Sequence, residues 1–131
     1  MKFFCNSSEL QKLVTIVEKA VPSRTTVPVL ENVLMELSNG WLKVRGNDME
    51  LGIEDAIQIQ NSQQDGAVLI KAKTLSTILA KLPNMSLSVE VKPNFSVLLK
   101  GEHVDFDILG LSSQEYPEFD CWNALQQCTW F

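Results

Sequence analysis

The side chains in this sequence that are best suited to bind a ligand are basic, and they gather around two predicted helices. An exposed ammonium or guanidinium group can bind a phosphate or a carboxylate. Lysines also favour exposed helix positions without any ligand, and from charge alone this plainer interpretation is preferred. Six basic residues lie on or beside the segments 7–21 and 72–82, namely Lys12, Lys19, Arg24, Lys71, Lys73 and Lys81.

The chain as a whole is acidic, with a net charge of −5 from sixteen Asp and Glu against eleven Lys and Arg. This balance argues against a protein whose entire surface binds nucleic acid. Segregated charges can still present one basic face on an acidic protein. The acids fall mostly in predicted strands and turns, among them Glu50, Glu54, Asp55, Asp105, Asp107, Glu115, Glu118 and Asp120.

Catalytic and metal-binding patterns are sparse. His103 and Asp105 are alternate residues of a predicted strand and share a face, but no nucleophile stands at a defined spacing from them. There is no glycine-rich phosphate loop, no paired-histidine spacing and no Gly-x-Ser-x-Gly motif. Cys5, Cys121 and Cys128 lack the short paired spacings of zinc sites. We therefore predict no enzyme activity, no cofactor and no metal site.

Length and composition indicate one globular unit. A chain of 131 residues with 45% hydrophobic residues can build a single core without disulfides. No apolar run is long enough for a membrane helix, and residues 1–6 are too few for a signal peptide. Together with the odd number of cysteines, these features predict a reduced, cytoplasmic protein.

The elements that must position the basic residues occur twice, sixty-five residues apart. A short apolar run precedes each helix, at 3–5 and at 68–70, and three strand-like segments follow it. The repeat predicts an α+β domain with internal pseudo-symmetry. The i, i+3, i+4, i+7 pattern of a helix face is carried by Leu10, Leu13, Val14 and Val17, and again by Leu75, Ile78, Leu79 and Leu82.

The first half, residues 1–62, is predicted to start with a strand over 1–5. Ser7 or Ser8 caps the following helix, Gln11 completes a weak capping box, and the helix runs to Val21 before Pro22. Residues 22–26 form an exposed connection and 27–37 are extended. Residues 38–40 form a hairpin turn, 41–45 return antiparallel, 46–48 turn again, and 50–60 form a strand.

The second half, residues 66–120, follows a polar loop over 61–66 and repeats the plan. We expect a strand at 67–71, a helix at 72–82 ended by Pro83, and strands at 86–92, 95–100 and 103–110. Both βαβββ units place their helices on one face of antiparallel sheets, which leaves Lys12, Thr15 and Lys19 pointing outward. Residues 121–131 read as a segment connecting to a missing second domain, with a terminal strand as the alternative.

Four segments carry a resemblance to a known family. Residues 24–34, RTTVPVLENVL, resemble the Arg-x-Thr-Leu-Pro-Ile-Leu-x-Asn stretch of the N-terminal domain of the bacterial sliding clamp, the beta subunit of DNA polymerase III. Residues 42–51 resemble the family's hairpin with a Thr-Asp-Leu-Glu-type turn, and 73–83 its second helix. Residues 116–120 resemble its Phe-Pro-x-x-Asp connection. The order and spacing match over residues 1–120.

The resemblance implies the DNA-clamp fold and a non-catalytic processivity factor. In this family two chains of three domains each form a homodimeric ring around duplex DNA and tether the replicative polymerase without sequence specificity. Lysines on helices that line the pore contact phosphates and read no bases. The implied partners are double-stranded DNA, a second clamp subunit, and a clamp loader and polymerase that bind through domains absent here.

The resemblance also implies roles for individual residues. Arg24 matches an arginine with which the family contacts DNA, and Lys12, Lys19, Lys71, Lys73 and Lys81 are the helix candidates. The strand over 102–110 resembles the edge that pairs with the third domain of the partner subunit. The implied interface residues are Phe106, Ile108, His103, Thr74 and Ile78. The plainer interpretation makes Phe106 and Ile108 ordinary core residues.

An alternative function is a stand-alone, clamp-like interaction module that does not encircle DNA. The family's client-binding pocket lies in later domains, so no client is assigned to this chain. For the fragment by itself we expect only weak, salt-sensitive DNA binding.

Overall fold

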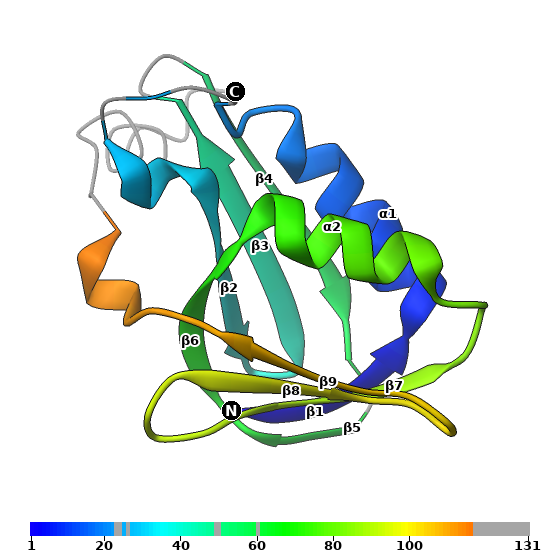
Figure 1. Ribbon diagram of the computed structural model, residues 1–131. Helices are drawn as coiled ribbons and strands as arrows, with labels where there is room; N and C mark the ends of the chain where they lie inside the picture. The colour runs from blue at the N-terminus through cyan, green and yellow to red at the C-terminus, as the bar shows by residue number, and fades with distance from the viewer. Residues whose placement is uncertain (23–24, 26, 49–50, 60, 117–131) are drawn as a thin grey trace.

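Two helices and two antiparallel sheets make up the structure (Figure 1). The computed structural model describes residues 1–22, 25, 27–48, 51–59 and 61–116. In chain order the elements are β1 (Lys2–Asn6), α1 (Ser7–Glu18), the short 3-10 helix η1 (Pro28–Glu31), β2 (Asn32–Ser38), β3 (Trp41–Asn47), β4 (Gly52–Gln58), β5 (Asn61–Gln64), β6 (Gly66–Lys71), α2 (Ala72–Lys81), β7 (Ser86–Val91), β8 (Ser96–Lys100), β9 (Asp105–Leu109) and the 3-10 helix η2 (Ser113–Glu115). Sheet A has the order β5-β1-β7-β8-β9, and sheet B has the order β4-β3-β2-β6.

Each half of the repeat contributes its first strand to the sheet of the other half. β1 pairs with β7, where Phe3 lies opposite Val89, and β6 pairs with β2, where Val68 lies opposite Met35. Phe3 and Val68 are equivalent positions of the repeat. The predicted α+β class and pseudo-two-fold repeat are confirmed. The exchange also means that neither half completes its sheet by itself.

The main apolar core lies between the inner faces of the sheets and the helices. Figure 1 shows α1 and α2 side by side across these faces. Leu10 and Leu13 of α1, and Leu75 and Leu79 of α2, are at most 2% exposed, as the helix pattern predicts. Burying one such side chain contributes about 1.5–3 kcal/mol. Helix α1 packs tightly on β3, because a Cβ at Gly46 would lie 3.0 Å from the Val17 side chain and backbone.

The ends of α1 differ from the prediction. Asn6 is the N-cap, since its side-chain oxygen accepts from the Ser8 backbone N–H at 2.9 Å. Ser7 is engaged elsewhere: its hydroxyl donates to the Pro83 carbonyl at 2.8 Å and accepts from the Met85 N–H at 3.0 Å. The helix ends at Glu18 rather than Val21, because the ring of Pro22 clashes with the carbonyl four residues earlier.

Three further boundaries are corrected. Residues 28–31 form η1 instead of extended chain, with Pro28 supplying the fixed φ at its first position. Residues 46 and 47 belong to β3 and not to a turn. Residues 61–64 are not a loop but β5, an edge strand that pairs with β1. The predicted 38–40 hairpin turn is confirmed, with φ of 52° at Asn39 and 79° at Gly40.

None of the described helices is both long enough and apolar enough to cross a membrane. The two regular helices span 12 and 10 residues, whereas a membrane-spanning helix needs about 20.

Candidate nucleic-acid interface

The outward faces of α1 and α2 form one basic surface. Lys12 and Lys19 are exposed on the side of α1 opposite its buried leucines, and Lys73 and Lys81 are exposed on α2. Lys71, the N-cap residue of α2, is exposed as well. A separation of seven residues places the Cα atoms of Lys12 and Lys19 about 10.5 Å apart along the helix axis. We call these five lysines, 12, 19, 71, 73 and 81, the helix-face lysines.

Acidic residues scarcely neutralise this surface. The two helices carry only Glu9 and Glu18 as acids, and the Glu18 side chain is partly buried, with its Oε2 enclosed and without a hydrogen-bond partner in the described chain. Among the residues that the structure describes, no helix-face lysine forms an ion pair within 4.0 Å. Five cations therefore face solvent on one layer of the molecule.

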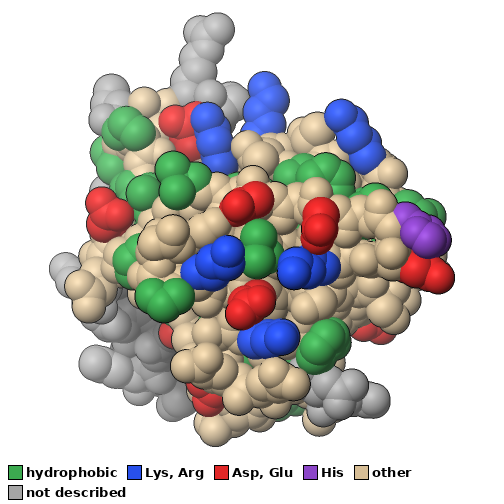
Figure 2. Space-filling model, turned by 60° about the horizontal axis from the view of Figure 1, so that its bottom comes forward, with side chains coloured by type: hydrophobic (Ala, Val, Ile, Leu, Met, Phe, Trp, Pro, Cys, Tyr) green, Lys and Arg blue, Asp and Glu red, His purple; other side chains and the backbone are tan. Residues whose placement is uncertain are grey.

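The sheet surfaces have a different charge pattern. Figure 2 shows Lys and Asp or Glu side chains interspersed on one side of the molecule. On the outer side of sheet A, Lys2 lies directly opposite Glu90, and Lys100 lies opposite Asp105. On sheet B, Arg45 donates to Glu54 at 2.9 Å and Lys43 lies 3.8 Å from the same carboxylate. Sheet cations therefore have carboxylates as neighbours, which lowers their attraction for an external anion.

A cleft of about 450 Å³ separates the C-terminal end of α1 from the N-terminal end of α2. Lys71 and Lys73 line it together with Glu18 and Glu31. No side chain caps the first turn of α2 and no acid lies in that turn, so its free N–H groups add positive potential beside the two lysines. The carboxylates limit the net charge of the cleft, and the basic surface depends mainly on the exposed lysines.

The residues predicted to contact DNA are thus brought together in five of six cases, all on the helix layer. Arg24 lies outside the described residues, and its assignment stays a prediction. Thr15 and Thr77 are exposed between the lysines, and the Thr77 hydroxyl donates to the Lys73 carbonyl at 2.7 Å. Small side chains between the cations leave room for a duplex backbone to approach.

The residues predicted for a subunit interface lie on β9, in the turn before it and on α2. Ile108 is 7% exposed and packs in the domain core, and Phe106 packs partly against the same core. His103 is exposed in the turn before β9. Thr74 and Ile78 are half-buried on one side of α2. The inward direction of Phe106 and Ile108 agrees with a role in the core, and their contact with a partner stays a prediction.

Two potential nucleophiles among the described residues, Cys5 and Tyr116, have raised pKa values. Burial, and secondly the charge of Glu9, raises the pKa of the Cys5 thiol to about 12. Burial likewise raises the pKa of Tyr116 to about 12. In the described part of the chain, no three His, Cys, Asp or Glu side chains gather as a metal site would require. The helix-face lysines make the outward surface of α1 and α2 suited to binding anions.

Sequence patterns did not predict one structural feature, the attachment of the segment after β9 to sheet B. Leu111 and Leu69 exchange two backbone hydrogen bonds of 3.0 Å. Tyr116 then packs with Leu30 and Leu69, and its hydroxyl accepts from the Asn47 side-chain amide at 3.0 Å. The resemblance of residues 116–120 to a connecting segment was the sequence signal here, and it does not identify the partners of Tyr116.

Comparison with known proteins gives a consistent assignment. Residues 1–120 match the family model described as DNA polymerase III beta subunit, N-terminal domain. The chain is 31% identical to the beta sliding clamp of Bacillus subtilis over 124 residues, covering 89% of this chain and 33% of that protein. It is 35% identical to the beta sliding clamp of Synechococcus elongatus over 121 residues, covering 90% and 32%. The chain therefore spans about a third of the length of these relatives.

Solved structures agree with the sequence comparison. A protein assigned as a DNA polymerase III beta subunit from Eubacterium rectale superposes with a TM-score of 0.85 at 37% identity, over 91% of this chain and 32% of that one. The sliding clamp of Bacillus subtilis gives a TM-score of 0.83 at 29% identity, over 91% and 33%. The fold is thus the DNA-clamp fold. The chain belongs to the family of the DNA polymerase III beta subunit, and its residues 1–120 correspond to that family's N-terminal domain.

Proposed function

We propose that this chain supplies the N-terminal domain of a sliding clamp, a non-catalytic processivity factor that encircles duplex DNA and tethers the replicative polymerase. The observation that carries the proposal is the charge pattern: five exposed lysines without ion-pair partners among the described residues lie on the helix layer, whereas sheet cations have carboxylate neighbours. Family membership supports the same role.

Lysine side chains suit a sliding contact. Each ammonium group is a point charge on a flexible stem, so it can follow successive phosphates without fixing one geometry. Phosphate contacts carry no base information and release counterions, which makes the attraction independent of sequence and sensitive to salt. Moderate attraction from Lys12, Lys19, Lys73 and Lys81 would keep the duplex centred, while a closed ring would prevent dissociation. Arg24 is proposed to add a further DNA contact.

The proposed ring needs surfaces at which domains join. β9 is an edge strand of sheet A, paired only with β8 among the described strands, and an unpaired edge can accept a strand from another domain. We assign β9 to the contact with a second clamp subunit, with Phe106, Ile108, His103, Thr74 and Ile78 around it. Residues 121–131 are proposed to lead from the 1–120 domain into a second domain.

Partners beyond DNA and the second subunit are proposed to bind elsewhere. The relatives are about three times as long as this chain, so a clamp loader and polymerase would contact domains outside it. Such a factor would work where the chromosome is replicated, in the cytoplasm of a bacterium.

DNA topology provides the test. The full-length gene product should form a dimer that, once loaded, remains on nicked circular DNA and is lost after a restriction enzyme linearises that DNA. A DNA-binding protein that does not encircle DNA would remain equally on both forms. Equal retention, or a natural product of 131 residues that never dimerises, would support the stand-alone interaction module instead.

A further inference from the structure

A partly buried carboxylate group lies among the cations of the helix layer. Glu18 is the last residue of α1 and lines the cleft of about 450 Å³ between α1 and α2. Its Oε2 atom is enclosed and has no hydrogen-bond partner among the described residues. Within the described chain Glu18 also forms no ion pair within 4.0 Å, although Lys71 and Lys73 line the same cleft. The cleft therefore contains an unpaired carboxylate beside two lysines.

Glu18 does not stabilise its own helix. The C-terminal end of a helix carries a partial negative charge, so an acidic residue there is unfavourable. The last turn of α1 contains no basic residue that could offset it. A buried carboxylate oxygen without a hydrogen bond has also lost its hydration without gaining a partner. Both effects oppose folding, so the stability of α1 gives no reason for a carboxylate at this position.

Without Glu18, the cleft would attract a phosphate group. The first turn of α2 has no side-chain cap and no acidic residue, and the free N–H groups of a helix N-terminus favour anions. Lys71 is the N-cap of α2, and Lys73 lies in its first turn. A cleft of this volume is large enough to admit a phosphate group. These groups together would hold a phosphate at one fixed place.

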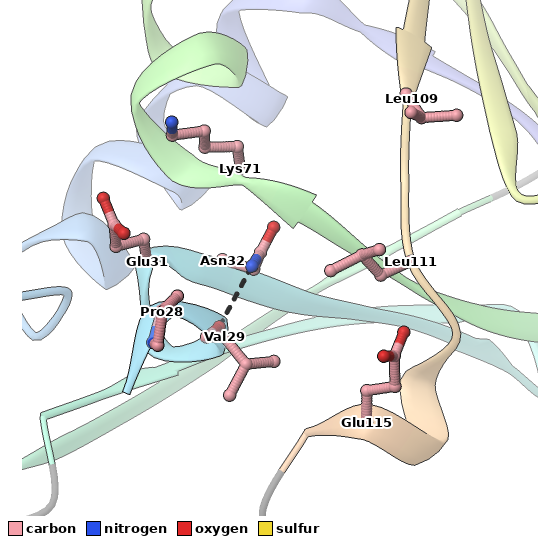
Figure 3. A pocket seen from close by; sticks show the side chains of 8 residues that line it. All are labelled: Pro28, Val29, Glu31, Asn32, Lys71, Leu109, Leu111 and Glu115. Carbon is pink, nitrogen blue, oxygen red and sulfur yellow. Dashed lines mark hydrogen bonds between the residues drawn. The ribbon is translucent and has the colours of Figure 1, made fainter. Parts of the chain in front are cut away.

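Two glutamates oppose this attraction. Glu31 of η1 is the second acid in the cleft, so two glutamates and two lysines leave it without a net formal charge. In Figure 3 the side chains of Lys71 and Glu31 extend to the same side, away from Leu109. Because one oxygen of Glu18 is enclosed, water and salt screen its charge less than they screen an exposed carboxylate. Glu18 thus lowers the positive potential at the start of α2, and the lysines outside the cleft keep theirs.

We propose that Glu18 limits the attraction of the helix layer for DNA, because it prevents the start of α2 from holding a phosphate of the duplex. A strong phosphate site at one place would retain the duplex at discrete positions and slow its movement through a ring. With Glu18 present, contact depends on exposed lysines, whose flexible stems can follow successive phosphates. The inference rests on the proposed function, and it adds a residue that weakens DNA binding to those proposed to strengthen it.

Glu18→Gln in the full-length protein tests the proposal, since it removes the charge and keeps the size of the side chain. Its affinity for a short duplex, measured by fluorescence anisotropy, should rise about threefold or more at low salt. The slope of log affinity against log salt should become steeper, by up to about 0.9 for each copy in contact with DNA. On loaded circular DNA the variant should diffuse more slowly than wild type in single-molecule tracking. Wild-type affinity, slope and diffusion in Glu18→Gln would overturn the proposal.

Two matched variants separate the cleft from general effects. Glu18→Asp retains the charge and should stay within about twofold of wild-type affinity. Glu90→Gln makes the same change in net charge on the outer face of sheet A, where Glu90 lies opposite Lys2, and should leave the slope unchanged. An equal gain in Glu90→Gln would assign the effect to net charge and would overturn the role of the cleft. Urea unfolding checks the structure, since Glu18→Gln should be at least as stable as wild type.

Retention on nicked circular DNA distinguishes this inference from the proposed function. If wild type is lost on linearisation and Glu18→Gln binds and diffuses as wild type does, the clamp function stands and the role of Glu18 is wrong. If wild type remains equally on circular and linear DNA, the proposed function is wrong, and the inference that rests on it is overturned with it.

Discussion

The helix layer and the outer face of sheet A carry the same kinds of charged side chain in opposite arrangements. On the helices, Lys12, Lys19 and Lys73 face solvent without an ion-pair partner among the described residues. On the sheet, Lys2 and Lys100 each have a carboxylate residue directly across the adjacent strand. The net charge of the chain does not reveal this difference. The chain as a whole has a net charge of −5, yet its helix layer presents a concentrated basic face. The placement of carboxylates, more than the number of lysines, distinguishes the two surfaces.

Secondary structure explains the contrast. Directly opposed residues of antiparallel strands have Cβ atoms about 4.5–5.5 Å apart, so alternating charges neutralise one another. On an amphipathic helix the outward residues recur at every third or fourth position, and here those positions hold lysine and threonine together with Ile16, Ala80 and one acid, Glu9. The helix layer can therefore attract a phosphate backbone, and the sheet face is suited to solvent.

Reversing the charge of the helix-face lysines should have the largest effect on DNA binding. In the full-length protein, Lys12→Glu, Lys19→Glu, Lys73→Glu and Lys81→Glu together should strongly reduce the amount retained on nicked circular DNA, because four attractive groups per subunit become repulsive and oppose loading, although a ring that does close would still not dissociate. Retention is measured by gel filtration of the loaded complex. The matched control reverses Lys2, Lys92 and Lys100 on the sheet side and should keep wild-type retention. Equal loss in both sets would show that the helix layer contributes no more to DNA binding than the sheet side does.

The two sides of α1 should differ in their effect on stability. Leu13→Ala removes a side chain that is 2% exposed and should cost about 2–5 kcal/mol in the free energy of unfolding. Ile16→Ala removes one that is 42% exposed and should cost less than about 1 kcal/mol. Urea unfolding of the 131-residue chain gives both values. Similar costs would show that α1 is not packed as described.

Neutralising a single lysine on either surface should have a smaller effect on DNA binding. Lys19→Gln should lower the slope of log affinity against log salt by about 0.9 for each copy of the lysine in contact with DNA. Lys100→Gln on sheet A should leave the slope unchanged. Fluorescence anisotropy with a short duplex across a salt series measures both. A smaller slope for Lys100→Gln alone would place DNA on the sheet side.

The segment after β9, which Leu111 and Tyr116 attach to sheet B, should affect stability and not DNA binding. Tyr116→Phe removes the hydrogen bond from Asn47 and should cost about 1 kcal/mol. Burial raises the pKa of Tyr116 from 10.0 to about 12, so the folded state favours the neutral phenol. That contribution is complete below pH 10 and is lost as the pH rises toward 12.

Urea unfolding between pH 8 and about 12 measures this effect. The Tyr116→Phe chain should lose less stability than wild type across the alkaline range. It should still lose some, since the raised pKa of Cys5 contributes in the same direction. An identical alkaline loss in wild type and Tyr116→Phe would contradict the buried position of Tyr116.

Much of the fold could be predicted because local patterns agree with it. The apolar spacing at 10, 13, 14 and 17 and its repeat at 75, 78, 79 and 82 identified both helices, and the Ser38-Asn39-Gly40 turn marked the β2–β3 hairpin. The basic surface followed from the same periodicity, since outward positions are defined once the buried ones are known. Here local and tertiary preferences coincide.

The rest depends on contacts between distant residues. Asn61–Gln64 reads as a loop because it is polar, and it becomes a strand only because β1 offers an edge to pair with. Ser7 resembles an N-cap, but Pro83 and Met85, seventy-six and seventy-eight residues away, occupy its hydroxyl. The exchange of β1 and β6 between the sheets likewise arises from long-range pairing, which sequence periodicity does not encode.

Photo-crosslinking gives the most direct test that the helix layer faces DNA. A benzophenone amino acid is placed in the full-length protein at Thr15 or Thr77 on the helices, or at Phe4 or Leu98 on the outer face of sheet A. Each protein is loaded on nicked circular duplex and irradiated. Crosslinks to DNA from the helix positions and none from the sheet positions are expected. Crosslinks from Phe4 or Leu98, with none from Thr15 and Thr77, would contradict the assignment of the helix layer as the DNA-facing surface.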